Sequence, residues 1–140
     1  MTQIKDQFVL FYSNGCIYSN FYPAKFQDPS LMRNIPETSK YYDDKEFEFL
    51  HVEQYMHACK ALLFKDIDIL DKILDATDPI ETKTLGRKVA DFDDKTWTNV
   101  ARDIVTRGCW LKFSQNDALK EEMVKTGDRE FVECAPRDTR

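Results

Sequence analysis

In residues 49–64, FLHVEQYMHACKALLF, the hydrophobic period changes from that of a strand to that of a helix. The preceding residues Lys45–Leu50, KEFEFL, alternate between charged and apolar side chains, which predicts a short strand. From Val52 onward the apolar residues recur three or four positions apart, as on one face of an amphipathic helix. The residues on this face are Val52, Tyr55, Met56, Cys59, Leu62 and Leu63.

A second stripe on the same helix carries the polar residues Glu53, His57 and Lys60. At helical spacing these three lie within about 60° of one another, apart from the apolar face. Glu53 falls in the first turn, where the helix dipole favours an ionised carboxylate. The pattern fits either a solvated face with an ordinary capping acid or the wall of a ligand pocket.

The rest of the chain predicts an α+β fold, mostly helical, with a small β-sheet in a single domain spanning residues 1–140. The residues from Asp28 to Asp44 contain two prolines and little periodicity, which predicts a long surface loop. Further strands are expected at 8–12, close to Phe26, and at 130–133. Further helices are expected at 67–74, from an Asp78 N-cap through Val89, after Asp93-Asp94 through Leu111, and at 114–127.

Composition excludes several classes of function. The chain of 140 residues has a net charge of −5, so long-range attraction does not favour nucleic acid, although a local basic cleft remains open. It has only four glycines and contains neither a P-loop nor a G-x-G-x-x-G motif. The four cysteines include no C-x-x-C pair, and His51 and His57 do not share a helix face, so no metal and no cofactor are expected. No secretory signal or membrane span is recognised, which predicts a cytoplasmic protein.

Two features outside the first helix could contribute to a site. Trp97 lies in phase with the apolar stripe of its helix, so it is either a core residue or a stacking surface for a ring. Lys83 and Arg87 are four positions apart, so they are either a phosphate clamp or a solvated basic face. These patterns alone leave the function undecided.

The ordered blocks SNFYPAKF, VEQYMHACKALLF, KTLGRKV, FDDKTW, KFSQN and TGDREFVECAPRD closely resemble the NADAR superfamily of YbiA-like N-glycosidases. The resemblance covers Phe11 to Asp138 and implies an enzyme that hydrolyses the bond between a ribose anomeric carbon and a nitrogen. It implies ADP-ribosylated guanine in nucleic acid, or a related N-ribosyl nucleotide, as the substrate. Phosphoribosylated intermediates of riboflavin synthesis are the alternative substrate, and a non-catalytic ADP-ribose-binding module is the alternative function.

The resemblance also assigns site residues. The family's catalytic glutamate, tryptophan and late aspartate correspond to Glu53, Trp97 and Asp138. Other matching positions are expected to bind substrate, and Lys83 is added to them through its spacing from Arg87: Ser19, Asn20, Phe21, Lys60, Lys83, Gly86 and Arg87. An ionised Glu53 would stabilise the positive charge that builds on the sugar in an oxocarbenium-like transition state, or deprotonate the attacking water.

The chain departs from the family pattern in three places. It ends at Arg140, before the family's Trp-Gly motif, which predicts a domain that lacks the C-terminal segment. The 28–44 loop is longer than the usual connection, so it either covers the pocket or is tolerated surface. Gln54 stands where a histidine is common in the family.

Overall fold

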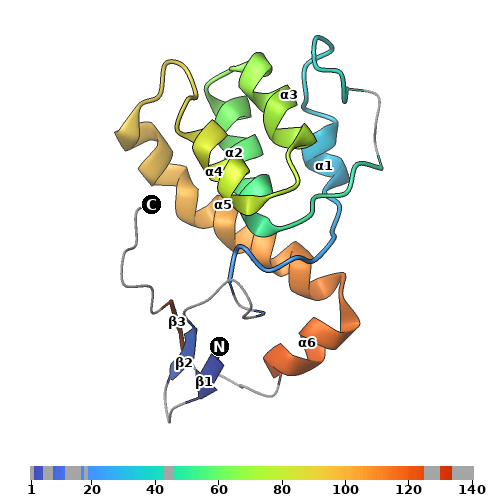
Figure 1. Cartoon of the computed structure of the whole chain (residues 1–140), viewed down its shortest axis with the longest axis vertical. Helices are drawn as coiled ribbons and strands as arrows, with labels where there is room; N and C mark the ends of the chain where they lie inside the picture. Colours follow the sequence, from blue (N-terminus) through green and yellow to red (C-terminus); the bar gives the residue numbers. More distant parts are fainter. Residues whose placement is uncertain are drawn as a thin grey trace.

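The computed structural model describes residues 2–4, 8–11, 17, 19–42, 46–124 and 130–133, and for residues 2–4, 8–11, 123 and 130–133 it describes the backbone alone. Helices α2 to α5 form the main body of the molecule, and α2 contacts α3, α4 and α5 (Figure 1). In chain order the elements are β1 (Thr2–Ile4), β2 (Phe8–Phe11), α1 (Pro29–Met32), α2 (Val52–Leu63), α3 (Ile67–Asp75), α4 (Pro79–Gly86), α5 (Asp94–Ser114), α6 (Asp117–Val124) and β3 (Glu130–Glu133).

The predicted α+β class is wrong, because the body from residue 19 to residue 124 is helical and contains no strand in its described part. Strand β2 pairs antiparallel with β1 and parallel with β3, with Phe11 opposite Thr2 and Phe8 opposite Glu130. Among the described elements, these three short strands contact only one another. They therefore do not form a layer that packs with the helices.

The strands predicted at 45–50 and near Phe26 shrink to one isolated bridge between Phe26 and Phe49. Their backbones exchange two hydrogen bonds, of 3.0 and 2.8 Å. The pairing does not extend because the residues two positions further on, Asp28 and His51, are the N-caps of α1 and α2. A further backbone bond, from the Ala24 N–H to the Leu50 carbonyl at 2.9 Å, is out of register with a regular antiparallel ladder.

Aspartates cap α1, α3, α4 and α5, and the sequence predicts two of these starts, those of α4 and α5. The side chain of Asp78 accepts from the Ile80 N–H ahead of Pro79, and that of Asp93 accepts from the Thr96 N–H. These bonds satisfy backbone donors that have no partner inside the helix. The predicted starts of α4 and α5 are confirmed.

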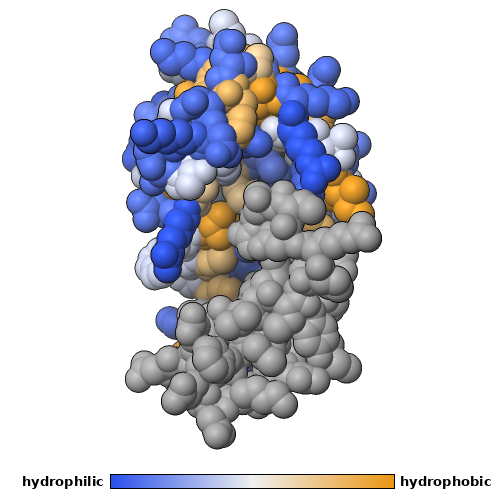
Figure 2. Space-filling model, turned by 90° about the vertical axis from the view of Figure 1, so that its left-hand side faces the viewer, coloured by the Kyte–Doolittle hydropathy of each residue, from blue (hydrophilic) through white to orange (hydrophobic). Residues whose placement is uncertain are grey.

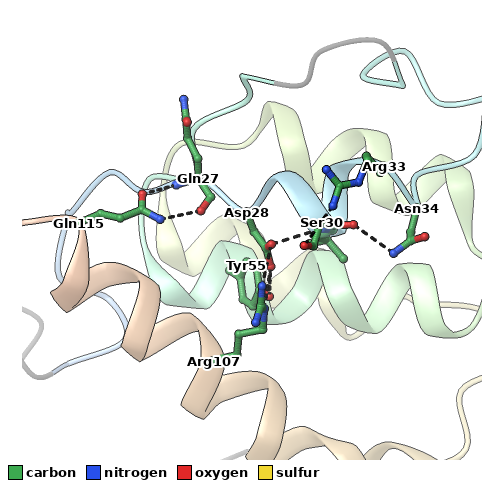
Figure 3. A network of polar contacts seen from close by, with 9 residues as sticks. Gln27, Asp28, Ser30, Arg33, Asn34, Tyr55, Arg107 and Gln115 are labelled. Atoms are coloured by element: carbon green, nitrogen blue, oxygen red, sulfur yellow. Dashed lines mark hydrogen bonds and ion pairs between the residues drawn. The ribbon is translucent and has the colours of Figure 1, made fainter.

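The segment from Asp28 is not the long surface loop that was predicted. Its first residues form α1, and Met32 and Ile35 are buried in the core. Asp28, 1% exposed, accepts hydrogen bonds from Tyr55 on α2 at 2.6 Å and from Arg107 on α5 at 3.0 and 3.1 Å (Figure 3). Burial alone would raise the pKa of Asp28, but the hydrogen bonds from Arg107, Tyr55 and Leu31 together lower it. An ionised Asp28 thus connects α1, α2 and α5.

Helix α2 is buried on every side along its first two turns, rather than on one apolar face. All residues from Val52 to Cys59 are buried, including the polar Glu53, Gln54 and His57. Gly108 of α5 allows this close packing, since a Cβ there would lie 3.0 Å from the Tyr55 ring and 3.2 Å from Val52.

Gln54 joins three segments through a single amide. Its side chain is fully buried, and its Nε2 donates to the backbone carbonyls of Ile73 and Ala76 at 3.2 and 3.1 Å. Its Oε1 accepts from the Leu50 N–H. The amide therefore bonds to carbonyls at the end of α3 and to a donor ahead of α2, and so links these two segments.

His51 caps the N-terminus of α2 as a neutral imidazole. Its Nδ1 accepts from the Gln54 N–H at 3.0 Å, and its Nε2 lies 3.3 Å from the Thr77 carbonyl, to which it donates. Burial lowers the pKa of His51, and the opposing effects of the Thr77 carbonyl and the Glu53 carboxylate do not reverse this. Protonation of Nδ1 would remove the acceptor on which the cap depends.

Hydrophilic residues cover most of the described surface on the face shown in Figure 2, with a narrow band of apolar residues between them. Within the described parts of the chain, no helix combines the length and the apolar character needed to cross a membrane.

Replacing Gln54 with leucine should lower the free energy of unfolding by about 3 kcal/mol, because the change removes a buried amide that accepts from the Leu50 N–H and donates to the carbonyls of Ile73 and Ala76. Urea unfolding measures the change. Gln115→Leu is the matched control: it removes an amide that also bridges backbone groups, at Gln27, but at an exposed position, so a loss below about 1 kcal/mol is expected. Equal losses in the two variants would contradict the assigned role of Gln54.

The lowered pKa of His51 predicts a loss of stability in mild acid. The unfolded chain binds this proton below about pH 6.5, whereas the folded chain resists it to lower pH. The free energy of unfolding should therefore be at its full value above pH 6.5 and fall as the pH drops towards the lowered folded-state pKa. Urea unfolding at pH 7.5, 6.5 and 5.5 measures this fall.

His51→Asn provides the control, because asparagine caps helices well but does not titrate. Any contribution from His57 is common to both proteins. The fall between pH 7.5 and 5.5 should be smaller in the variant, and an equal fall in both would show that His51 is not its source.

Candidate active site

One cavity of about 650 Å³ lies between α2, α4 and α5, within the range typical of small-ligand sites. Its described lining combines one buried acid with several cations and two aromatic rings. The lining residues are Glu53, Met56, His57, Lys60, Lys83, Arg87, Phe92, Asp94, Trp97, Thr98, Ala101, Arg102, Val105 and Thr106. We refer to this space as the Glu53 cavity.

Five of the predicted catalytic and substrate-binding residues line this cavity, and they come from α2, α4 with its C-terminal cap, and α5. Glu53 and Lys60 come from α2, Lys83 from α4, Arg87 from its C-terminal cap and Trp97 from α5. The polar stripe of α2 is therefore a pocket wall, and not the solvated face that its pattern also allowed.

Glu53 stands in the first turn of α2 and is only 2% exposed. Its backbone N–H donates to the carbonyl of Asn20 at 3.0 Å, which fixes the first turn against the preceding loop. The fully buried Lys112 holds that loop, because its Nζ donates to the carbonyls of Ser19, at 3.0 Å, and Ile17. The position of the carboxylate therefore depends on a lysine of α5 that lies in the KFSQN block but was not predicted to contribute to the site.

Lys60 is a half-buried cation about two turns further along the same face of α2. Its Nζ lies 4.5 Å from the centroid of the Phe92 ring and 5.8 Å from that of Trp97. Burial lowers the pKa of Lys60, the nearby Arg87 lowers it further, and Glu53 raises it. The amine thus couples electrostatically to both the acid and the basic side of the cavity.

Trp97 is half-buried and borders the cavity, so it does not belong to the buried core in which its helical phase could have placed it. Phe92, just ahead of α5, is 41% exposed and packs edge-on against Phe64, with ring centroids 5.3 Å apart. Together with Lys60 these two rings form an aromatic and cationic side of the cavity.

Other predicted site residues lie away from the lining. Ser19 is buried and its Oγ accepts from the Phe21 N–H, which shapes the loop ahead of α2. Phe21 lines a separate cavity of about 620 Å³ beside His51 and Pro79. Gly86 reaches the Glu53 cavity only through the His57 ring that packs on it, and Asp138 lies outside the described residues.

Apart from Trp97, the residues of α5 that line the cavity were not predicted from the sequence. Asp94, Thr98 and Arg102 are spaced four apart and run alongside a second row that includes Trp97 and Ala101. Both rows follow from helical spacing once one of their members is known to face a ligand. Phe92 lies before the helix, and no periodicity signals it.

Groups that bind metals are sparse near this cavity. Within the ranges described, no three His, Cys, Asp or Glu side chains gather as a metal centre would require. Cys59 and Cys109 form no disulfide with a described residue, and the Cys109 thiol donates to Asn20 Oδ1 at 3.7 Å. Burial raises the pKa of Cys59 to about 12.

Two curated relatives cover most of this chain. Protein irg-1 of Caenorhabditis elegans is 38% identical over 133 residues, which span 94% of this chain and 62% of that protein. An N-glycosidase of Acanthamoeba polyphaga mimivirus is 37% identical over 123 residues, 87% of this chain and 65% of the relative. The chain thus spans less than two thirds of the length of either relative.

The fold is similar to the NMR structure of the E. coli protein YbiA, with a TM-score of 0.70 at 20% identity, over 99% of this chain and 73% of that one. The sequence model of the NADAR domain matches residues 10–140. Because this match covers almost the whole chain, the protein belongs to the NADAR domain family.

Proposed function

We propose that this protein is an N-glycosidase that releases ADP-ribose from ADP-ribosylated guanine. The observation that carries the proposal is a nearly fully buried carboxylate, Glu53, at a cavity that also presents cations and aromatic rings. The similarity to a relative named as an N-glycosidase supports the same class of reaction.

The chemistry requires a group such as Glu53. As the bond between the ribose anomeric carbon and the base nitrogen breaks, positive charge builds on the sugar. A desolvated carboxylate stabilises this charge far better than one in bulk water. Water then adds its hydroxyl to the anomeric carbon, its proton passes to Glu53 or to solvent, and the base leaves with the electrons of the broken bond.

The cations of the cavity suit a diphosphate. Lys83 and Arg87 reach the cavity from α4 and its cap, and Arg102 faces them from α5. Charge-assisted hydrogen bonds from lysine and arginine to phosphate oxygens are among the stronger polar contacts in proteins. Several cations on opposing helices favour ADP-ribose, with two phosphates, over a monophosphate nucleotide.

The aromatic side of the cavity suits a base. Trp97 and Phe92 both border it, and Lys60 lies over both rings. Stacking on such rings contributes about 1–3 kcal/mol per base and tolerates different bases. A flipped or free guanine can therefore stack there while the ribose of the attached ADP-ribose group faces Glu53.

Glu53→Gln should reduce the rate of base release from ADP-ribosylated guanosine by at least about 100-fold, because the amide keeps the shape and loses the charge that stabilises the transition state. Chromatographic detection of the two products, guanosine and ADP-ribose, measures the rate. The affinity for ADP-ribose, measured by calorimetry, should stay within about 3-fold, since the ground-state ligand needs no anion at this position.

Glu81→Gln is the control, because Glu81 is an exposed acid in the first turn of α4 and does not line the cavity. Its rate should match that of the unchanged protein. Full turnover by Glu53→Gln would contradict the proposal, and ADP-ribose binding without turnover by the unchanged protein would indicate a binding module instead. Release of base only from a ribosylaminouracil phosphate would move the substrate to riboflavin intermediates.

Lys83→Ala and Arg87→Ala should each raise KM for ADP-ribosylated guanosine about 10-fold with little change in kcat, because both remove a phosphate contact made equally in ground and transition states. Steady-state kinetics at two salt concentrations measure the effect, which should shrink at high salt. Lys72→Ala, an exposed lysine of α3, is the control for net charge and should leave KM unchanged. A drop in kcat with KM constant would place these cations at the reacting bond instead.

A further inference from the structure

His57 is a buried polar group that the fold leaves unsatisfied. Its ring is 6% exposed, and neither Nδ1 nor Nε2 has a hydrogen-bond partner among the described residues. Leaving a buried polar atom without a partner is destabilising, because the atom loses its hydrogen bonds to water and gains none in return. His51, on the same helix, has partners for both nitrogens, so the local structure is able to satisfy an imidazole.

The ring faces the acid assigned to catalysis. His57 Nε2 lies 3.5 Å from Glu53 Oε2, one helical turn away, and both side chains are almost fully buried. This separation is slightly longer than an N–H···O hydrogen bond, and the contact does not qualify as one. A shift of a few tenths of an ångström in either side chain would form the bond.

Helix α4 makes room for the ring at this place. A Cβ on Gly86 would lie 2.0 Å from His57 Nδ1 and 2.6 Å from Cε1, so any side chain there would displace the imidazole. Gly86 therefore leaves the space that the His57 ring occupies beside Glu53.

The chemistry of the two groups fixes the direction of the bond. An ionised carboxylate only accepts, and a neutral imidazole carries one donor and one acceptor nitrogen. The nitrogen that faces Glu53 must therefore carry the hydrogen, which leaves Nδ1 bare against Gly86. The cavity presents other charged groups around this pair, and they come from all the elements that enclose it: Lys60, Lys83, Arg87, Asp94 and Arg102.

We propose that His57 is a positioning residue that orients the Glu53 carboxylate through an Nε2–H···Oε2 hydrogen bond. This bond forms fully when substrate fills the cavity. This inference rests on the proposed function for its effect on catalysis. The bond occupies Oε2 and leaves Oε1 to face the anomeric carbon. Without it the buried carboxylate can rotate, and a misplacement of about 1 Å can reduce a rate by about 100-fold.

Two substitutions separate positioning from packing. His57→Leu keeps the bulk of the ring and removes the donor, so kcat should fall about 30- to 100-fold with KM within about 3-fold. His57→Gln restores an N–H of similar reach and should recover kcat to within about 5-fold of the unchanged protein. Leu62→Met, a volume-conserving change on the same helix, should leave kcat unchanged. Equal losses in the leucine and glutamine variants, or a loss confined to KM, would overturn the proposal.

The tautomer of His57 tests the contact in the unchanged protein, independently of turnover and of whether the variants fold. In the presence of ADP-ribose, ¹⁵N chemical shifts of the neutral ring should show a protonated Nε2 and a bare Nδ1. A protonated Nδ1 would overturn the inference even if the protein is a glycosidase. Conversely, the expected tautomer in a protein that releases no base would retain the His57–Glu53 contact and reject the proposed function.

Discussion

The complete burial of the first two turns of α2 is the constraint on which the rest of the structure depends. A helix packed against α3, α4 and α5 together has no solvent face for its polar residues at this end. Each polar side chain there must then find a partner in the protein or face a cavity. His51 and Gln54 find protein partners, and Glu53 and His57 face the cavity.

Residues that stabilise the fold and residues that line the cavity therefore alternate between positions 51 and 57. His51 caps the helix, and Gln54 satisfies the end of α3, so their bonds set the orientation of α2. That orientation directs Glu53 into the cavity, where desolvation strengthens its interaction with a developing positive charge. The scaffold and the site are thus built from adjacent residues that point in different directions.

The sequence predicts most of the helices, because their start signals are local. Aspartate followed by proline or a polar first turn marks α4 and α5 within one or two residues. It does not predict how the helices pack: the polar stripe of α2 looks the same whether it faces solvent or a cavity. The expected strands near Phe26 and Phe49 stay short because Asp28 and His51, two residues beyond the bridge, begin the helices α1 and α2.

The candidate site is predictable only in part. Family resemblance singles out Glu53, Lys60, Arg87 and Trp97, and the fold brings them to one cavity. Lys112, which anchors the loop ahead of Glu53, and Phe92, which completes the aromatic side, lie in blocks that resemble the family, but helical spacing assigns neither of them to the site. Their roles depend on contacts between segments far apart in the chain, which a single sequence does not encode in its spacing.

The most direct test of the account is a crystal structure of the Glu53→Gln protein with ADP-ribose bound. The proposed role of Glu53 predicts that the ribose anomeric carbon lies about 3–4 Å from the carboxamide of residue 53, with the diphosphate near Lys83 and Arg87. ADP-ribose bound instead in the second cavity, beside Phe21 and Pro79, would contradict it.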